Sequence, residues 1–176
     1  MLVLVVGPSG AGKDSLLNAA REAFRDDLRM IFARRVITRP ADPYGENHEP
    51  VSETEFAARD FALSWSAHGL HYGIPAAVLD AAPVVVANVS RGVIADTARR
   101  YDVRVIEVAA PPEILAARLA ARGRESNVDV ARRLARIADI PDGVAVETVW
   151  NDGTLEEGIE RFILALRRVA DDQLAS

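Results

Sequence analysis

The stretch that decides the fold is Leu2-Val3-Leu4-Val5-Val6-Gly7-Pro8-Ser9-Gly10-Ala11-Gly12-Lys13-Asp14, after which apolar residues recur at helical spacing from Ser15. The unbroken apolar run before Gly7 is typical of a strand buried on both faces of a parallel sheet. A strand, a glycine-rich turn, a lysine and a helix, with the spacing G-x-x-x-x-G-K from Gly7 to Lys13, form the pattern of a phosphate-binding loop. We therefore predict that this turn binds the phosphates of a nucleotide.

Each part of the loop has a physical reason. Glycine accepts positive φ angles and lets backbone N–H groups approach phosphate oxygens closely. The helix that begins near Lys13 adds the positive end of its dipole, and the lysine adds a full charge for the β- and γ-phosphates. The alternative, a buried strand and a tight turn that bind nothing, leaves this ordered pattern unexplained. The predicted nucleotide-binding residues are Gly7, Pro8, Ser9, Gly10, Ala11, Gly12, Lys13, Asp14 and Ser15.

One position departs from the motif. The residue after Lys13 is usually Ser or Thr, whose hydroxyl binds Mg²⁺, whereas this chain has Asp14 followed by Ser15. We expect Asp14, with or without Ser15, to hold Mg²⁺ directly or through water. The alternative is that Asp14 is only a negative charge favoured by the dipole at the start of a helix.

The bulk composition narrows the class of protein. A chain of 176 residues suits a single domain with a proper core, so we treat residues 1–176 as one domain. The net charge of −5 disfavours nucleic acid as a partner. The sequence has no cysteine, which is compatible with a reducing cytosol, and we expect a cytoplasmic protein. The first apolar run is too short to span a membrane, so no membrane partner is expected; the oligomeric state is left open.

The rest of the chain alternates strands and helices. Apolar runs predict strands over residues 30–33, 83–88, 103–108 and 144–150, and helical patterns cover 15–24, 93–101, 111–121, 127–138 and 155–170. This alternation predicts an α/β fold with a largely parallel sheet. An insert over about residues 39–75 interrupts it, where we expect a capping box at Ser52, short strands around a turn at His68-Gly69, and a helix from Pro75. We expect this insert to bind a substrate.

Polar residues follow the strand at 83–88. Asn88, Ser90 and Arg91 come at its carboxyl end, which is the edge where parallel α/β sheets bind ligands. The three histidines His48, His68 and His71 do not form a metal-ligand pattern, and we expect them to be structural or surface residues.

These motifs, in this order, resemble the guanylate kinase-like group of P-loop kinases over nearly the whole chain. The resemblance implies a three-layer α/β/α fold with a mostly parallel sheet and ATP as the phosphate donor. Beyond the nucleotide loop it rests on Thr38-Arg39-Pro40, Gly45-Glu46, Trp65, Gly69, Tyr72-Gly73, Arg118-Leu119, Arg122-Gly123-Arg124-Glu125 and Asn151-Asp152.

Three departures argue against GMP as the acceptor. Ser64 stands where guanylate kinases carry the Glu that reads the guanine edge, the segment after Gly45-Glu46 is short and lacks a tyrosine, and the aspartates expected after the strand at 84–87 are absent. A site built to hydrogen-bond guanine loses selectivity without these partners. Instead, the combination of Gly12-Lys13-Asp14-Ser15, Ile37-Thr38-Arg39, Glu46-Asn47-His48, Leu63-Ser64-Trp65 and Asn88-Val89-Ser90-Arg91 resembles the ribose 1,5-bisphosphate phosphokinases of phosphonate catabolism.

That resemblance implies that ATP phosphorylates the 1-phosphate of ribose 1,5-bisphosphate, giving 5-phosphoribosyl 1-diphosphate (PRPP) and ADP. The attacking phosphate oxygen would be mostly ionised at neutral pH, because the second pKa of such a phosphate is about 6, so no strong general base is expected. Two alternatives stay open: a nucleoside monophosphate kinase, guanylate kinase included, and a non-catalytic guanylate kinase-like binding module.

The resemblance also implies roles for residues outside the loop. Arg39 and Tyr72, with Arg35 as a helper, would bind one acceptor phosphate, although Tyr72 could equally be core and Arg35 a solvated charge. Asn47, Ser64 and Asn88 are candidates for the ribose hydroxyls, Arg91 could bind the second phosphate, and Ser90 is a further substrate-binding candidate. Arg118 begins a lid over about residues 118–136, and Asn151 would contact adenine. The residues expected to act in catalysis are Lys13, Asp14, Arg39, Arg122 and Arg124.

Overall fold

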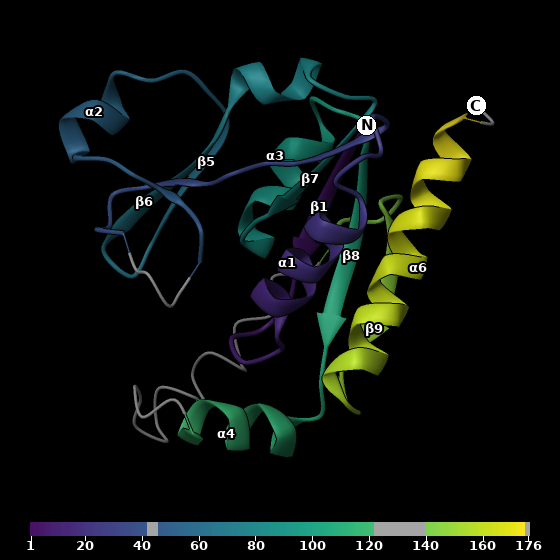
Figure 1. Ribbon diagram of the computed structural model, residues 1–176. Helices are drawn as coiled ribbons and strands as arrows, with labels where there is room; N and C mark the ends of the chain where they lie inside the picture. The colour runs from purple at the N-terminus through teal and green to yellow at the C-terminus, as the bar shows by residue number, and fades with distance from the viewer. Residues whose placement is uncertain (42–45, 122–139, 175–176) are drawn as a thin grey trace.

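A parallel sheet forms the centre of the molecule (Figure 1). The computed structural model describes residues 1–41, 46–121 and 140–174. Its larger sheet runs in the order β2-β7-β1-β8-β9, formed by Met30–Phe32, Val84–Asn88, Leu2–Val6, Val103–Ala109 and Ala145–Trp150. Every neighbouring pair is parallel, so the carboxyl ends of these strands meet at one edge.

The central strand β1 is buried on both faces. Val3 and Val5 belong to one core cluster, whereas Leu2, Leu4 and Val6 belong to another. Because side chains alternate between the two faces of a strand, an unbroken apolar run is what a strand between two packed layers requires. The phosphate-binding loop therefore leaves the sheet directly from a fully buried strand.

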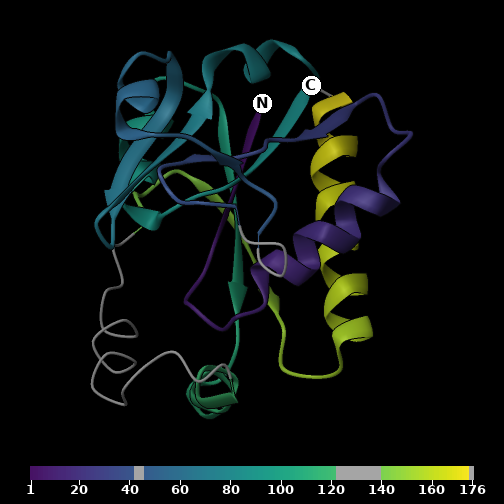
Figure 2. The same cartoon turned by 60° about the vertical axis from the view of Figure 1, so that its left-hand side comes forward.

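Three helices contribute to the core on one face of the sheet. They are α1 (Lys13–Ala23), α4 (Pro112–Ala121) and α6 (Leu155–Leu174). Leu16 of α1 and Phe162 of α6 are fully buried in this cluster together with Val3 and Val5. Figures 1 and 2 show α1 and α6 side by side against the sheet, with α4 beyond its carboxyl edge.

The opposite face is covered by α3 (Ile94–Ala98), by the 3₁₀ helix η2 (Arg91–Val93) before it, and by a second sheet. The second sheet has the order β4-β3-β6-β5, formed by Glu49–Pro50, Val36–Ile37, Leu70–Pro75 and Phe61–Ala67. Leu63 of β5 and Ile74 of β6 enter the same core as Leu4 of β1. The insert is thus anchored to the main sheet by apolar burial rather than by the chain alone.

Most of the expected elements are confirmed. The capping box at Ser52 forms at the start of α2 (Glu53–Ala57), and His68 and Gly69, at φ 55° and 74°, make the hairpin turn between β5 and β6. Two helices differ from expectation: the segment after Pro75 is the 3₁₀ helix η1 (Ala76–Asp80), and the expected helix at 93–101 is the shorter α3. The helix expected at 127–138 lies outside the described residues.

Within residues 1–41, 46–121 and 140–174, no helix is long and apolar enough to cross a bilayer.

The core beside α6 provides a test of this packing. Phe162→Ala removes a fully buried ring, and we expect a loss of about 3–5 kcal/mol in the free energy of unfolding, from lost transfer energy and a residual cavity. Urea unfolding followed by circular dichroism measures it. Leu164→Ala, on the same helix with its side chain half exposed, is the matched control and should change stability by less than about 0.5 kcal/mol. Equal losses in the two variants would contradict the assignment of Phe162 to the core.

Candidate active site

The glycine-rich loop packs tightly against the neighbouring strand. Gly7 has φ 150°, and a Cβ on this residue would collide with the carbonyl oxygen of Val108 in β8. Gly12 has φ 91° at the N-cap of α1, a conformation that favours glycine. The N–H of Ala11 donates to the carbonyl of Pro8 at 3.2 Å, which closes the turn. The loop therefore has the backbone shape that the motif predicts, at the carboxyl edge of the sheet.

Lys13 lies over this loop. Its Nζ donates to the carbonyl oxygens of Gly7 at 2.6 Å and Pro8 at 3.0 Å. The ammonium group is held beside the first turn of α1, where the helix dipole also favours an anion. A phosphate at this turn would meet a full positive charge as well as the end of the helix.

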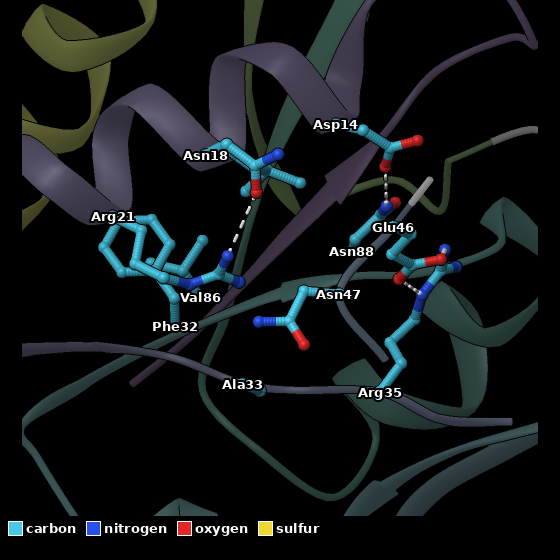
Figure 3. Close-up of a pocket in the computed structure, with 11 residues that line it drawn as sticks. Asp14, Asn18, Arg21, Phe32, Ala33, Arg35, Glu46, Asn47, Val86 and Asn88 are labelled. Atoms are coloured by element: carbon cyan, nitrogen blue, oxygen red, sulfur yellow. Dashed lines mark hydrogen bonds and ion pairs between the residues drawn. The ribbon is translucent and has the colours of Figure 1, made fainter. Parts of the chain in front are cut away.

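A pocket opens next to the loop (Figure 3). It is lined by Asp14, Leu17, Asn18, Arg21, Phe32, Ala33, Arg35, Glu46, Asn47, Val86 and Asn88. Asn88, at the end of β7, donates its Nδ2 to Oδ1 of Asp14 at 3.2 Å. Asp14, Asn88, Asn47 and Arg35, predicted from four separate segments, thus come together in one hollow. Ser15 is exposed on α1 but does not line it.

Two arginines, Arg35 just before the insert and Arg39 at its start, converge on one carboxylate. Arg35 forms a two-point ion pair with Glu46, and Nη2 of Arg39 lies 3.7 Å from an oxygen of Glu46. The side chain of Arg35 is only 14% exposed, so it is not a solvated surface charge. Its guanidinium lies 5.4 Å from the ring centroid of Tyr72, which is buried and stacks on Trp65. The predicted phosphate residues Arg35, Arg39 and Tyr72 therefore meet, and Tyr72 and Trp65 also serve as core.

His48 is buried within this group and ties it together. Its Nε2 lies 3.0 Å from the carbonyl oxygen of Arg39, and its Nδ1 lies 3.0 Å from the carbonyl oxygen of Glu46. The same Nδ1 is 3.3 Å from Nη2 of Arg39. Sequence reasoning expected His48 to be structural or on the surface, and the structure confirms a structural role. Sequence reasoning used Gly45-Glu46 for the resemblance but gave the side chain of Glu46 no role in the site; the signal was an acidic residue in the polar segment that follows the basic residues 34–39.

The remaining predicted acceptor residues lie elsewhere. Ser64 and Ser90 line a second, open hollow of about 390 Å³ between β5 and the η2–α3 segment. Arg91 forms an ion pair with Glu107 of β8, and both side chains are largely buried. Glu107 was missed, although a glutamate inside the apolar run at 103–108 is a visible departure from the pattern. Among the predicted acceptor residues, Arg35, Asn47 and Asn88 therefore line the first hollow and Ser64 and Ser90 the second, whereas Arg39, Tyr72 and Arg91 line neither of the two.

Two further residues, Arg118 and Asn151, were predicted to bind the nucleotide. Nη1 of Arg118, on α4, donates to the carbonyl of Gly10 at 3.4 Å. Asn151, directly after β9, is buried and donates its Nδ2 to the carbonyl of Ala11 at 2.7 Å. These contacts are to the loop itself; the expected contact of Asn151 with adenine stays a prediction. Arg122 and Arg124, and the lid beyond residue 121, lie outside the described residues.

Known proteins resemble this chain in sequence and in fold. A family model described as an AAA domain matches residues 3–139. The ribose 1,5-bisphosphate phosphokinase PhnN of Acidiphilium cryptum is 53% identical over 97% of this chain and 94% of its own length. The bifunctional ribose 1,5-bisphosphokinase-thymidine phosphorylase of Cupriavidus pinatubonensis is 53% identical over 96% of the chain, which spans 29% of that longer protein. The crystal structure of guanylate kinase from Anaplasma phagocytophilum matches 97% of the chain, and 85% of its own, with a TM-score of 0.67 at 18% identity.

The fold and the loop define a P-loop α/β protein of the guanylate kinase-like type. The identity to full-length relatives is more specific. The chain belongs to the ribose 1,5-bisphosphate phosphokinase family.

The role of His48 can be tested through stability. His48→Ala removes a buried ring that contacts the carbonyls of Arg39 and Glu46, so we expect a loss of about 1–3 kcal/mol in the free energy of unfolding. Thermal and urea unfolding measure it. Leu28→Ala, at a residue that is 92% exposed, is the control and should change stability by less than about 0.5 kcal/mol. An unaltered unfolding midpoint in His48→Ala would show that the ring does not hold the segment.

Proposed function

We propose that this protein transfers the γ-phosphoryl group of ATP to the 1-phosphate of ribose 1,5-bisphosphate, producing PRPP and ADP. The names of the full-length relatives support this substrate. The observation that carries the proposal is the pocket of Figure 3, which joins the first turn of α1 to the Arg35–Glu46 group. A phosphate acceptor held there would face a donor held at the glycine-rich loop.

The reaction asks for positioning and charge neutralisation rather than a strong base. The acceptor oxygen is already mostly ionised at neutral pH, because the second phosphate pKa is about 6. As it bonds to the γ-phosphorus, the bond from that phosphorus to the β,γ-bridging oxygen breaks and ADP leaves with the electron pair. The two reactants repel each other, so the protein must supply cations on both sides of the transferring group.

Different residues would neutralise the donor phosphates and the acceptor phosphate. Lys13 would neutralise the donor phosphates, and Arg39 would bind the acceptor phosphate. With two arginines and one carboxylate, the Arg35–Arg39–Glu46 group keeps one net positive charge for that anion. Arg118 is held against the donor loop, and Arg122 and Arg124 would close over the transferring group. The candidates for the acceptor's hydroxyls and second phosphate are Asn47, Ser64, Asn88, Ser90 and Arg91.

Mg²⁺ fits the residues beside the loop. Within the parts of the chain that the structure describes, no three His, Cys, Asp or Glu side chains gather as a metal site. Mg²⁺ usually keeps several waters and takes one or two protein carboxylates plus substrate phosphates, so the single carboxylate of Asp14 is a ligand of the kind that this ion uses. Asp14 is exposed after Lys13 and oriented by Asn88, so we propose it as the protein ligand, with or without Ser15. When bound, the ion would neutralise charge on the donor phosphates. We also propose a cytoplasmic location for this protein.

An acceptor screen tests the proposal. We expect release of ADP with ribose 1,5-bisphosphate and formation of PRPP, and much slower turnover with GMP, because Ser64 cannot read the guanine edge as a Glu would. A coupled assay for ADP and phosphorus NMR of the product measure both. Lys13→Ala should remove most activity with the fold intact, and serves as the background control. Faster turnover on GMP would favour a nucleoside monophosphate kinase, and no binding of Mg-ATP at millimolar concentration would favour a binding module.

The metal ligand can be tested separately. Asp14→Ala should raise the Mg²⁺ concentration needed for half-maximal activity several-fold, because a carboxylate that binds the ion is lost. A Mg²⁺ titration at saturating ATP measures it. Glu22→Gln, which removes an exposed acidic charge from the same helix, is the matched control. If both variants titrate like the unaltered protein, Asp14 does not hold the metal.

A further inference from the structure

We propose that Asn151 is a positioning residue for the phosphate-binding loop, acting through the carbonyl of Ala11 rather than through the adenine base. The inference rests on the proposed binding of ATP at this loop. The segment after β9 fixes the backbone conformation of the loop through this contact.

The hydrogen bonds of Asn151 fix both its backbone and its side chain. Its backbone N–H donates to the carbonyl of Ala109 at the end of β8 at 2.8 Å. Its side-chain Nδ2 donates to the carbonyl of Ala11 at 2.7 Å, a contact between residues 140 positions apart. The residue is only 3% exposed, so this bond is made away from solvent, where losing a partner is costly. Asn151 thus connects the end of β9 to β8 through its backbone N–H and to the loop through its side-chain amide.

Two glycines make room for this amide. A Cβ on Gly12, the N-cap of α1, would lie 2.5 Å from Nδ2 of Asn151. A Cβ on Gly158, within α6, would collide with Oδ1 of the same side chain. Glycine weakens a helix interior, so its presence in α6 is explained by this close approach. The amide is held between the starts of two helices and has little freedom to move.

The flanking residues are also held. Arg161 of α6 donates to the carbonyl of Trp150 and to Oδ1 of Asp152, each at 2.8 Å. The hydrogen bond from this guanidinium lowers the pKa of Asp152 from its usual value, so the pair stays ionised. Asn151 is therefore presented to the loop from a segment fixed on both sides.

The orientation of the amide explains why this residue is Asn. Oδ1 is buried and has no hydrogen-bond partner among the described residues. A flipped amide, or an aspartate, would place an oxygen against the carbonyl oxygen of Ala11 instead of an N–H donor. In the observed orientation Oδ1 has no partner, but Nδ2 keeps its hydrogen bond to the carbonyl of Ala11 in the loop. Because Ala11 stands between Gly10 and Gly12, releasing its carbonyl would release the turn that holds the phosphates.

Direct binding measurements test the proposal. Asn151→Asp and Gly158→Ala, which displaces the amide from the α6 side, should each weaken binding of Mg-ATP by about tenfold or more, because a misplacement of about 1 Å in positioned groups can cost about a hundredfold. Inorganic tripolyphosphate, which has no base, should be weakened by the same factor. Isothermal titration gives the dissociation constants, and circular dichroism at the same temperature verifies that each variant is folded. Thr148→Asp, on the exposed part of β9, controls for the added charge.

Each other outcome overturns the proposal. If Asn151→Asp weakens ATP but not tripolyphosphate, the residue acts on the base and not on the loop. If the variants lose thermal stability but bind both ligands normally, its role is purely structural. If the unaltered protein binds neither ligand at millimolar concentration, the proposed function fails together with this inference.

Discussion

The convergence of parallel strands on one edge is the constraint on which the rest of the structure depends. β1 ends in the glycine-rich loop, β7 ends at Asn88, and β9 is followed by Asn151. These segments are distant in sequence, but parallel pairing brings their carboxyl ends together. Burial of β1 on both faces fixes this edge, because all five of its residues pack in a core and moving the strand out of either layer would expose apolar side chains. The polar site is therefore a consequence of an apolar strand.

Two arginines near this edge of the sheet form ion pairs with glutamates. Arg35 is matched by Glu46 and Arg91 by Glu107, and all four side chains are largely buried. A buried guanidinium without a partner would cost free energy, so each carboxylate lets the fold keep an arginine where an anionic substrate could reach it. The carboxylates also limit the repulsion among cations before a substrate arrives. A phosphate dianion bound there, as we propose, would meet arginines whose positions are already fixed, which would lower the entropy lost on binding.

Local sequence patterns predicted much of the fold and part of the candidate site. The glycine-lysine spacing, the buried strands, the capping box at Ser52 and the turn at His68-Gly69 depend on neighbouring residues, and all were predicted. What could not be predicted depends on contacts between distant segments. Nothing local shows that Arg91 pairs with Glu107, or that Asn151 points inward to Ala11. The 3₁₀ geometry after Pro75 was missed for a related reason, since a short helix is decided by what it packs on.

The insert and the nucleotide loop are joined by a core rather than by a linker. Leu63 and Ile74 of the second sheet are buried against Leu4 of β1, three residues before Gly7. At about 25 cal/mol per Å² of apolar surface, burying two such side chains stabilises this contact by a few kcal/mol. That energy opposes any movement of β5 and β6 away from the main sheet. The distance from Arg35 and Arg39 to the loop is therefore set by apolar packing beneath them, and not by the charges that would use it.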